Sequence, residues 1–312
     1  MFGRRLQAII LVGFSGALAA FASGCRRDAA ADRSGGSGRI RIVCTTTMIE
    51  DLARAIAADA ALVEGIMKPG EDPHIYKVRP RDAQLIAEAD LVLMNGLHLE
   101  STLDHVVEHN ARKGRVVRLA ECPQIVPLDS EARQGARDPH CWFNVLYFRV
   151  YAERCRDALV EADPPNAATY RANADAYIRQ LDALHEEVKR RIDQIPRERR
   201  VMVTSHDAFQ YFGRTYDIDV FAVVGISTEQ QPRPQDVERL EALVRDRNVK
   251  ALFIETSVSN TLNDIVRKIA DKAGARIGGT LYSDSLGEPG TPAGTYIGMV
   301  RHNTEAIVAA LK

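Results

Sequence analysis

The sequence predicts an α/β protein built from two doubly wound α/β lobes that one long rigid helix joins. Three features of the 312-residue chain predict this architecture. Short apolar segments alternate with amphipathic helical patterns from residue 39 onward, the alternation restarts after Pro196, and a helical pattern of unusual length separates the two stretches. Such alternation is typical of parallel sheets with helices packed on their faces.

The long helical pattern occupies residues 164–195. The apolar positions that recur at spacings of three and four are Tyr170, Ala174, Tyr177, Leu181, Leu184, Val188, Ile192 and Ile195. We expect Asp163 to cap the helix and the prolines at 164 and 165 to occupy its first turn. Pro196 forbids continuation. At 1.5 Å per residue the helix would be about 45 Å long, which suits a connection between two lobes; an ordinary surface helix is the alternative.

The first stretch of the chain, residues 1–24, has the layout of a secretory signal peptide. Arg4 and Arg5 precede an apolar run over residues 8–22, and small residues lead to Cys25. This segment is similar to a bacterial lipobox, in which the cysteine is acylated and becomes the new N-terminus. We expect an exported protein, periplasmic or at the cell surface, that is tethered to the membrane through lipidated Cys25. Cleavage without lipidation is the alternative.

A short polar segment connects the signal peptide to a globular body of balanced charge. Residues 25–38 are rich in Gly, Ser and Ala, which is typical of a flexible tether. The chain carries 41 basic and 42 acidic side chains, a net charge of −1, with no long run of either sign. This balance excludes a nucleic-acid surface. The apolar fraction of 46% suffices for the cores of two moderate domains, and we expect a monomer.

The first lobe is expected over residues 39–163. Its predicted strands lie at residues 39–45, 61–67, 91–94 and 116–119, and its helices at 48–58, 80–89, 99–112 and 144–161. Residues 121–139 are expected to form an irregular loop. The strands are short, apolar and rich in Val, Ile and Leu, and Pro and Gly residues separate them from the helices.

The second lobe is expected over residues 196–312, where the same alternation returns. Its predicted strands lie at residues 200–204, 220–224, 251–254 and 276–278, and its helices at 207–216, 235–246, 261–273 and 295–311. The residues Phe209, Phe212 and Tyr216 recur at helical spacing, which predicts a core face rather than a ligand-stacking site.

Four side chains capable of binding a metal follow predicted strands or enter helices. They are His74, His140, His206 and Asp284, two from each predicted lobe. Ligands of open α/β sheets gather beyond the carboxyl ends of the strands, so these side chains are candidates for a common site. Three neutral imidazoles and one carboxylate suffice to bind a borderline divalent cation. Two of the histidines follow an Asp-Pro pair, at residues 72–74 and 138–140, and the proline restricts the backbone that presents the imidazole.

Several motifs resemble those of the cluster A-I solute-binding proteins, the extracytoplasmic receptors of zinc and manganese ABC importers, with TroA-like members most similar. They are Gly-Glu-Asp-Pro-His (70–74), Asn-Gly-Leu-His-Leu-Glu (95–100), Asp-Pro-His-Cys-Trp-Phe-Asn (138–144), Thr-Ser-His-Asp-Ala-Phe (204–209), Leu-Tyr-Ser-Asp-Ser-Leu-Gly (281–287) and Gly-Thr-Tyr-Ile-Gly-Met-Val-Arg-His-Asn (294–303). The resemblance covers about residues 39–312. It implies two α/β lobes joined by one long helix, a metal site in the interlobe cleft, and an importer permease as partner.

By these motifs, the ligand positions of the family fall on His74, His140, His206 and Asp284. The resemblance implies zinc binding, because manganese receptors of the family commonly carry Glu where His206 stands. Nitrogen ligands favour Zn²⁺ over Mn²⁺, although a bidentate aspartate would admit Mn²⁺. The His-rich loop of dedicated zinc receptors is absent from residues 121–138. We therefore expect zinc, with manganese as the alternative.

The chain also departs from the family pattern at one position of interest. Asn144 stands where the Asp-Pro-His-x-Trp motif usually ends in Asp, so we expect a carboxylate that orients a ligand imidazole to be missing. Glu229 and Glu255 are expected to be solvated or capping carboxylates, with a place in the cleft or behind a metal ligand as the alternative. His105 and His109 share a predicted helix face, which is typical of solvated histidines, with a second metal site as the alternative.

Two other functions compete with a metal receptor, namely a zinc hydrolase and a surface adhesin. A hydrolase would use the same cluster, but catalytic zinc normally keeps one position open for water, whereas four protein ligands fill a tetrahedral shell. The adhesin is implied only by some relatives of the family. The sequence leaves the pairing of its four remaining cysteines open, since they allow three connectivities or free thiols: Cys44, Cys122, Cys141 and Cys155.

Overall fold

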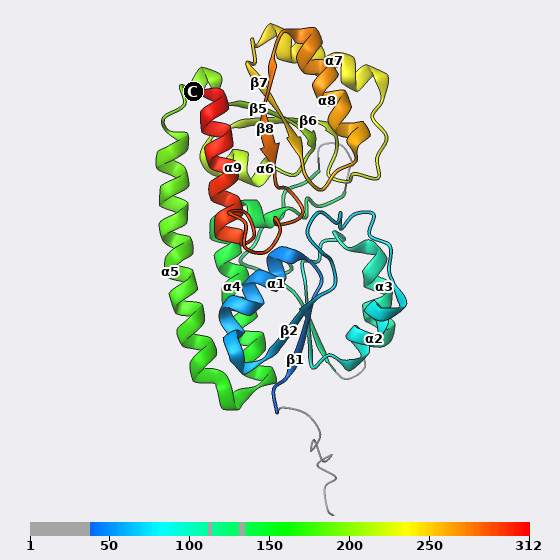
Figure 1. Ribbon diagram of the computed structural model, residues 1–312, viewed down its shortest axis with the longest axis vertical. Coiled ribbons are helices and arrows are strands. Elements are labelled where there is room, and N and C mark those ends of the chain that lie inside the picture. The colour runs from blue at the N-terminus through cyan, green and yellow to red at the C-terminus, as the bar shows by residue number, and fades with distance from the viewer. Residues whose placement is uncertain (1–37, 112–113, 131–134) are drawn as a thin grey trace, which may run out of the picture. The chain divides into compact units, whose positions relative to one another are not determined.

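Parallel strands flanked by helices form two α/β lobes in the part of the chain that the structure describes (Figure 1). This computed structural model describes residues 38–111, 114–130 and 135–312. The predicted signal peptide, Cys25 and all of the predicted tether except Gly38 lie outside these residues. Within them, no helix has both the length and the apolar character needed to cross a membrane.

The first lobe contains a four-stranded parallel sheet of order β2-β1-β3-β4. Its strands are β1 (Arg41–Cys44), β2 (Leu62–Gly65), β3 (Leu91–Met94) and β4 (Arg115–Arg118), and its helices include α1 (Thr47–Ala57), α2 (Pro80–Glu88) and α3 (Ser101–Asn110). Successive side chains of β3 are buried on opposite faces, since Leu91 and Leu93 pack with α1 while Val92 and Met94 pack with α2 and α3. The sheet is therefore covered on both faces, as a doubly wound fold requires.

The second lobe contains two parallel strand pairs that lie side by side. Strand β5 (Val201–His206) pairs with β6 (Asp219–Val224), β7 (Ala251–Glu255) pairs with β8 (Arg276–Leu281), and β5 contacts β7. Its helices are α6 (Gln210–Tyr216), α7 (Pro234–Asp246), α8 (Asn260–Ala273) and α9 (Tyr296–Leu311). Helices α7 and α8 cover one face, whereas α6 and α9 cover the other. The aromatic face of α6 is buried in the core, as its spacing predicts.

Two strands of the second lobe extend two or more residues beyond their predicted carboxyl ends. Strand β5 continues through His206, which pairs with Val224, and β8 continues to Leu281. The sequence does not predict the extension of β8 because it contains Gly278 and Gly279, and glycine is depleted in strands. At Gly278 a Cβ atom would lie 2.7 Å from Ala310 Cβ, so the missing side chain lets α9 pack against the strand.

The long predicted helix is present as α5 (Ala167–Ile192), 26 residues that follow α4 (Val145–Ala162) through one 3₁₀ turn. It packs against α4, α1 and α9, and all eight predicted apolar positions are buried. The predicted cap at Asp163 is wrong. Its carboxylate accepts hydrogen bonds from the side chains of Tyr170 and Asn166 instead, at 2.6 and 2.7 Å.

One hydrophobic core runs from the first lobe into the second. A single cluster of buried side chains contains Leu93 of β3, Leu184 of α5 and Phe253 of β7. Where the lobes meet, the ring of Tyr296 in α9 stacks on Phe148 of α4 with centroids 3.5 Å apart. Because the same core serves both lobes, they cannot separate widely without exposing apolar surface.

Four cysteines of the described residues are free thiols. Cys44, Cys141 and Cys155 are buried, and Cys122 is partly exposed. Burial raises the pKa of Cys141 and Cys155 to about 12, which keeps these thiols neutral and unreactive.

Truncation of the α5 stripe should destabilise the whole body. Leu184 is fully buried, so Leu184→Ala is expected to lower the free energy of unfolding by about 2–5 kcal/mol in urea denaturation followed by circular dichroism. The control Gln180→Ala changes an exposed residue one turn away on the same helix. It should change the free energy of unfolding by less than about 0.5 kcal/mol. Equal effects of the two variants would contradict the assignment of this stripe to the core.

Candidate metal centre

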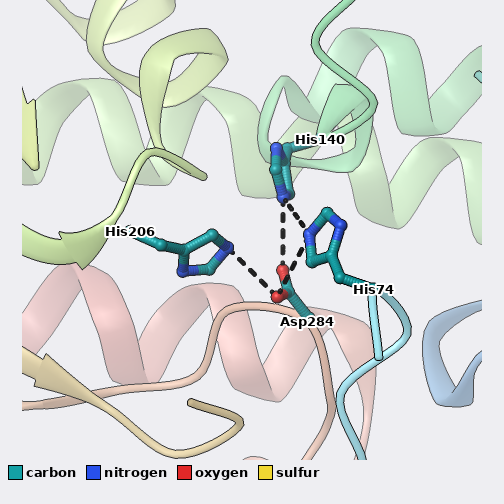
Figure 2. Close-up of side chains that lie close together, drawn as sticks. All are labelled: His74, His140, His206 and Asp284. Carbon is teal, nitrogen blue, oxygen red and sulfur yellow. Dashed lines mark hydrogen bonds and ion pairs between the residues drawn. The ribbon is translucent and has the colours of Figure 1, made fainter. Parts of the chain in front are cut away.

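The structure brings all four predicted site residues together. His74 lies on the loop between β2 and α2, His140 precedes α4, His206 ends β5, and Asp284 follows β8. Each offers one ligand atom, and these atoms lie within 4.8 Å of one another. Figure 2 shows the three rings and the carboxylate pointing toward a common centre.

Three separations between the ligand atoms are close to those around a small ion, whereas His74 Nε2 lies farther, 3.8 Å, from Asp284 Oδ2. His74 Nε2 lies 3.3 Å from His140 Nε2, and the Asp284 oxygens lie 3.1 Å from His206 Nε2 and 3.5 Å from His140 Nε2. A tetrahedral zinc ion with bonds of about 2.0–2.2 Å separates its ligand atoms by about 3.3–3.6 Å. The arrangement can therefore accept an ion with little movement of the side chains.

Three inner atoms of the cluster lack hydrogen-bond partners. His206 Nε2 and both carboxylate oxygens of Asp284 are buried and make no hydrogen bond with the protein. Buried polar groups are normally hydrogen-bonded, because leaving one unsatisfied costs about 1–3 kcal/mol. A cation at the centre would satisfy all of these atoms at once, so the residues fit a metal ion.

The two Asp-Pro-His turns have the same backbone arrangement but different side-chain contacts. In each turn the aspartate accepts a hydrogen bond of 2.9 Å from the backbone N–H of the histidine, which fixes the turn. Asp138 also lies 2.7 Å from His140 Nδ1, and this contact directs Nε2 toward the centre. Asp72 makes no such contact with the ring of His74.

Glu255 orients His206, the less favoured of the two roles that the sequence suggested for it. One carboxylate oxygen of Glu255 accepts hydrogen bonds of 2.8 Å from the backbone N–H groups of Ser205 and His206. The other lies 2.6 Å from His206 Nδ1. Glu255 is buried at the end of β7, so the expectation of a solvated or capping side chain is wrong. The feature of the sequence that could have indicated this role is the position of Glu255 at the carboxyl end of the strand beside β5.

Hydrogen bonds from both lobes hold the loop that carries Asp284. Trp142 Nε1 donates to the backbone carbonyl of Ser283, and the backbone N–H of Asp284 donates to Ser257 Oγ, both at 3.2 Å. The Trp142 ring also contacts the ring of His140, with centroids 5.2 Å apart. The tryptophan of the Asp-Pro-His-x-Trp motif therefore positions two members of the cluster.

The predicted consequence of Asn144 is wrong. Its side chain caps α4 by accepting hydrogen bonds from the backbone N–H groups of Leu146 and Tyr147. The carboxylate that orients His140 is Asp138, which the chain retains. Asn is as good an N-cap as Asp, so this departure from the family pattern leaves the site intact.

Burial and mutual charge set the protonation of the cluster. Burial lowers the pKa of His74 to about 3, so its imidazole is neutral. Burial also lowers the pKa of His206, but the Asp284 and Glu255 carboxylates outweigh this effect and hold it well above its usual value. Burial raises the pKa of Asp284, yet the neighbouring imidazoles, His206 foremost, bring it below its ordinary range. Coordination of a cation requires the loss of any proton on His206 Nε2.

An open cleft of about 1050 Å³ leads to one side of the cluster. Of the four candidate ligands only His74 lines it, while the side chains of the other three are fully buried. His105 and His109 lie apart from this cleft on α3, where His109 Nδ1 contacts the backbone carbonyl of His105 at 2.6 Å. In the described residues, the cluster around Asp284 is the single group with three or more possible metal ligands.

Comparisons with known proteins agree with the architecture. Residues 42–310 match the family described as ZnuA, zinc-uptake complex component A, periplasmic. The chain is 36% identical to the zinc-binding protein TroA of Treponema pallidum, with 91% of both chains covered. It is also 36% identical to the manganese-binding lipoprotein MntA of Bacillus subtilis, with 93% of this chain and 95% of the relative covered.

Solved structures show the same fold. The periplasmic zinc-binding protein TroA from Treponema pallidum superimposes with a TM-score of 0.83 over 88% of this chain and 99% of that one. A manganese-bound periplasmic metal-binding protein from Candidatus Liberibacter asiaticus, 28% identical, gives a TM-score of 0.79 over 88% and 100% of the two chains.

The family match spans nearly all of the body, two relatives are 36% identical to it over the aligned residues, and the lobes and the long helix agree with those of TroA. The chain therefore belongs to the ZnuA family of metal-binding substrate-binding proteins of ABC importers.

Proposed function

We propose that this protein captures Zn²⁺ through His74, His140, His206 and Asp284 and delivers the ion to the permease of an ABC importer. The observation that carries the proposal is the convergence of four possible metal ligands from both lobes on one point, where His206 Nε2 and both Asp284 oxygens have no hydrogen-bond partner. In this proposal residues 39–163 and 196–312 are the two lobes, residues 164–195 are the linking helix, and one chain acts as a monomer.

The donor set favours zinc over manganese. Imidazole nitrogens suit Zn²⁺, whereas Mn²⁺ prefers sites rich in carboxylate, carbonyl and water oxygens. Both oxygens of Asp284 face the cluster, so a bidentate carboxylate would extend the coordination shell for the larger Mn²⁺. The names of TroA and MntA, equally similar to this chain, support both metals, and we propose Zn²⁺ as the cargo with Mn²⁺ as a second, weaker ligand.

The same donor count argues for transport rather than hydrolysis. Four protein ligands complete a tetrahedral zinc shell, which leaves no position for a reactive water. The proposal therefore assigns no catalytic step to the cluster.

An extracytoplasmic location fits this function. The relatives include a periplasmic zinc-binding protein and a manganese-binding lipoprotein. We propose that residues 1–24 direct export and that acylated Cys25 tethers the receptor through residues 25–38, which keeps the metal-loaded body near the membrane permease.

Protein purified without added metal should contain one equivalent of zinc by elemental analysis. Asp284→Ala removes the only anionic donor of the cluster, so the zinc content should fall below about one tenth of an equivalent. The exposed control Asp271→Ala on α8 should retain the full equivalent. A full equivalent of zinc in Asp284→Ala would overturn the assignment of this site.

Glu255→Gln should weaken zinc binding about 10- to 100-fold in a competition titration with a fluorescent chelator. One oxygen of Glu255 accepts from two backbone N–H groups, and the other lies against Nδ1 of His206. A neutral amide cannot do both and also hold His206 in the tautomer that leaves Nε2 free. Glu229→Gln makes the same chemical change on an exposed side chain at the cleft and should alter the affinity less than twofold. Unchanged affinity in Glu255→Gln would remove its proposed orienting role.

Metal-free and metal-loaded protein should have indistinguishable radii of gyration in small-angle X-ray scattering. The continuous α5 and the shared hydrophobic core restrict the lobes to small movements. A large compaction upon metal binding would contradict this expectation, and the core variant Leu184→Ala serves as a control for loosened packing.

A further inference from the structure

The three histidines of the cluster are not held equally. Asp138 and Glu255 lie against Nδ1 of His140 and His206, at 2.7 and 2.6 Å. Among the described residues no group forms a hydrogen bond or ion pair with Nδ1 of His74. Its ring is therefore the least constrained of the three, because a carboxylate behind an imidazole fixes both its tautomer and its orientation.

His74 also occupies the position from which an ion can leave. It lies on a loop rather than at the end of a strand, and it is the one candidate ligand that lines the open cleft. The other three ligands are buried behind it with fully covered side chains. An ion that enters or leaves through the cleft must pass His74, so the position of this residue controls its exit.

The backbone around His74 is held by hydrogen bonds from the second lobe. Thr228 Oγ1 donates to Asp72 Oδ2 at 2.6 Å, while Asp72 Oδ1 accepts from the backbone N–H of His74 at 2.9 Å. Earlier in the same loop, the backbone N–H of Gly70 donates to Ser285 Oγ at 2.8 Å. The chain Thr228–Asp72–His74 thus connects the loop at residues 226–230 directly to the outermost ligand.

We infer that Thr228 is a positioning residue that sets how long the ion is retained. It holds the carboxylate of Asp72, Asp72 holds the backbone of His74, and His74 closes the coordination shell on the cleft side. Asp72 is buried, so losing the Thr228 hydroxyl leaves a carboxylate oxygen without its donor. Small lobe movements would break this hydrogen bond and release His74. The inference rests on the proposed metal-receptor function.

The test uses Thr228→Val, which keeps the shape of the side chain and removes its hydroxyl group. Zn²⁺ dissociation is measured by stopped flow into excess chelator, association is measured with Zn²⁺ alone, and apo thermal stability is recorded for each variant. Thr228→Ser restores the donor and is the rescue variant. Ser227→Ala is the matched control, because it removes the neighbouring hydroxyl, whose contact is a local one with the backbone N–H of Glu229.

Thr228→Val should raise the dissociation rate about tenfold, with less than a twofold change in the association rate. Thr228→Ser should return the dissociation rate to within about twofold of the original protein, and Ser227→Ala should not change it. An unchanged dissociation rate in Thr228→Val would overturn the inference. So would a rate in Thr228→Ser and Ser227→Ala that is raised as much as in Thr228→Val. These outcomes require that the original protein binds Zn²⁺; absence of binding there would overturn the proposed function instead.

Discussion

The burial of three imidazoles and one carboxylate around a single point is the constraint on which the rest of this structure depends. Removing these groups from water is costly because His206 Nε2 and both Asp284 oxygens lack hydrogen bonds, and a bound cation would recover that cost. The surrounding fold must therefore supply enough stability to hold the cluster together beforehand. A core that extends through both lobes and α5 does so, because the apolar surface it buries does not depend on the metal.

The four proposed ligands are divided between the lobes, so the geometry of the site depends on how the lobes are placed. His74 and His140 come from the first half of the chain, and His206 and Asp284 from the second. Contacts next to the cluster reinforce this placement, since Trp142 reaches Ser283 and Tyr296 reaches the backbone of Trp142. Small movements at this junction suffice to change the coordination, because metal–ligand bonds tolerate displacements of only a few tenths of an ångström.

The groups behind the ligands differ in a way that suits capture followed by release. Carboxylates lie behind His140 and His206, and the backbone N–H and serine contacts of Asp284 fix the third inner ligand. These three form a fixed inner set. His74, presented by a loop on the cleft side, completes the shell and depends on contacts that cross between the lobes. In the proposed receptor, one ligand that is more easily displaced than the others would favour release of the ion.

The sequence alone determined the alternation of strands and helices, the stripe of α5 and the identity of the four converging side chains, because periodicity, prolines and local motifs are properties of neighbouring residues. It also favoured the family, since the Asp-Pro-His turns and the Leu-Tyr-Ser-Asp segment are short and continuous. Only the tertiary structure decided what Glu255 and Thr228 contact, that Asn144 caps a helix and that Asp163 binds Tyr170. Some of these contacts join residues that are distant in the chain, and others compete with equally plausible local contacts. Packing of the whole fold selects among them, and no single segment of the sequence encodes that packing.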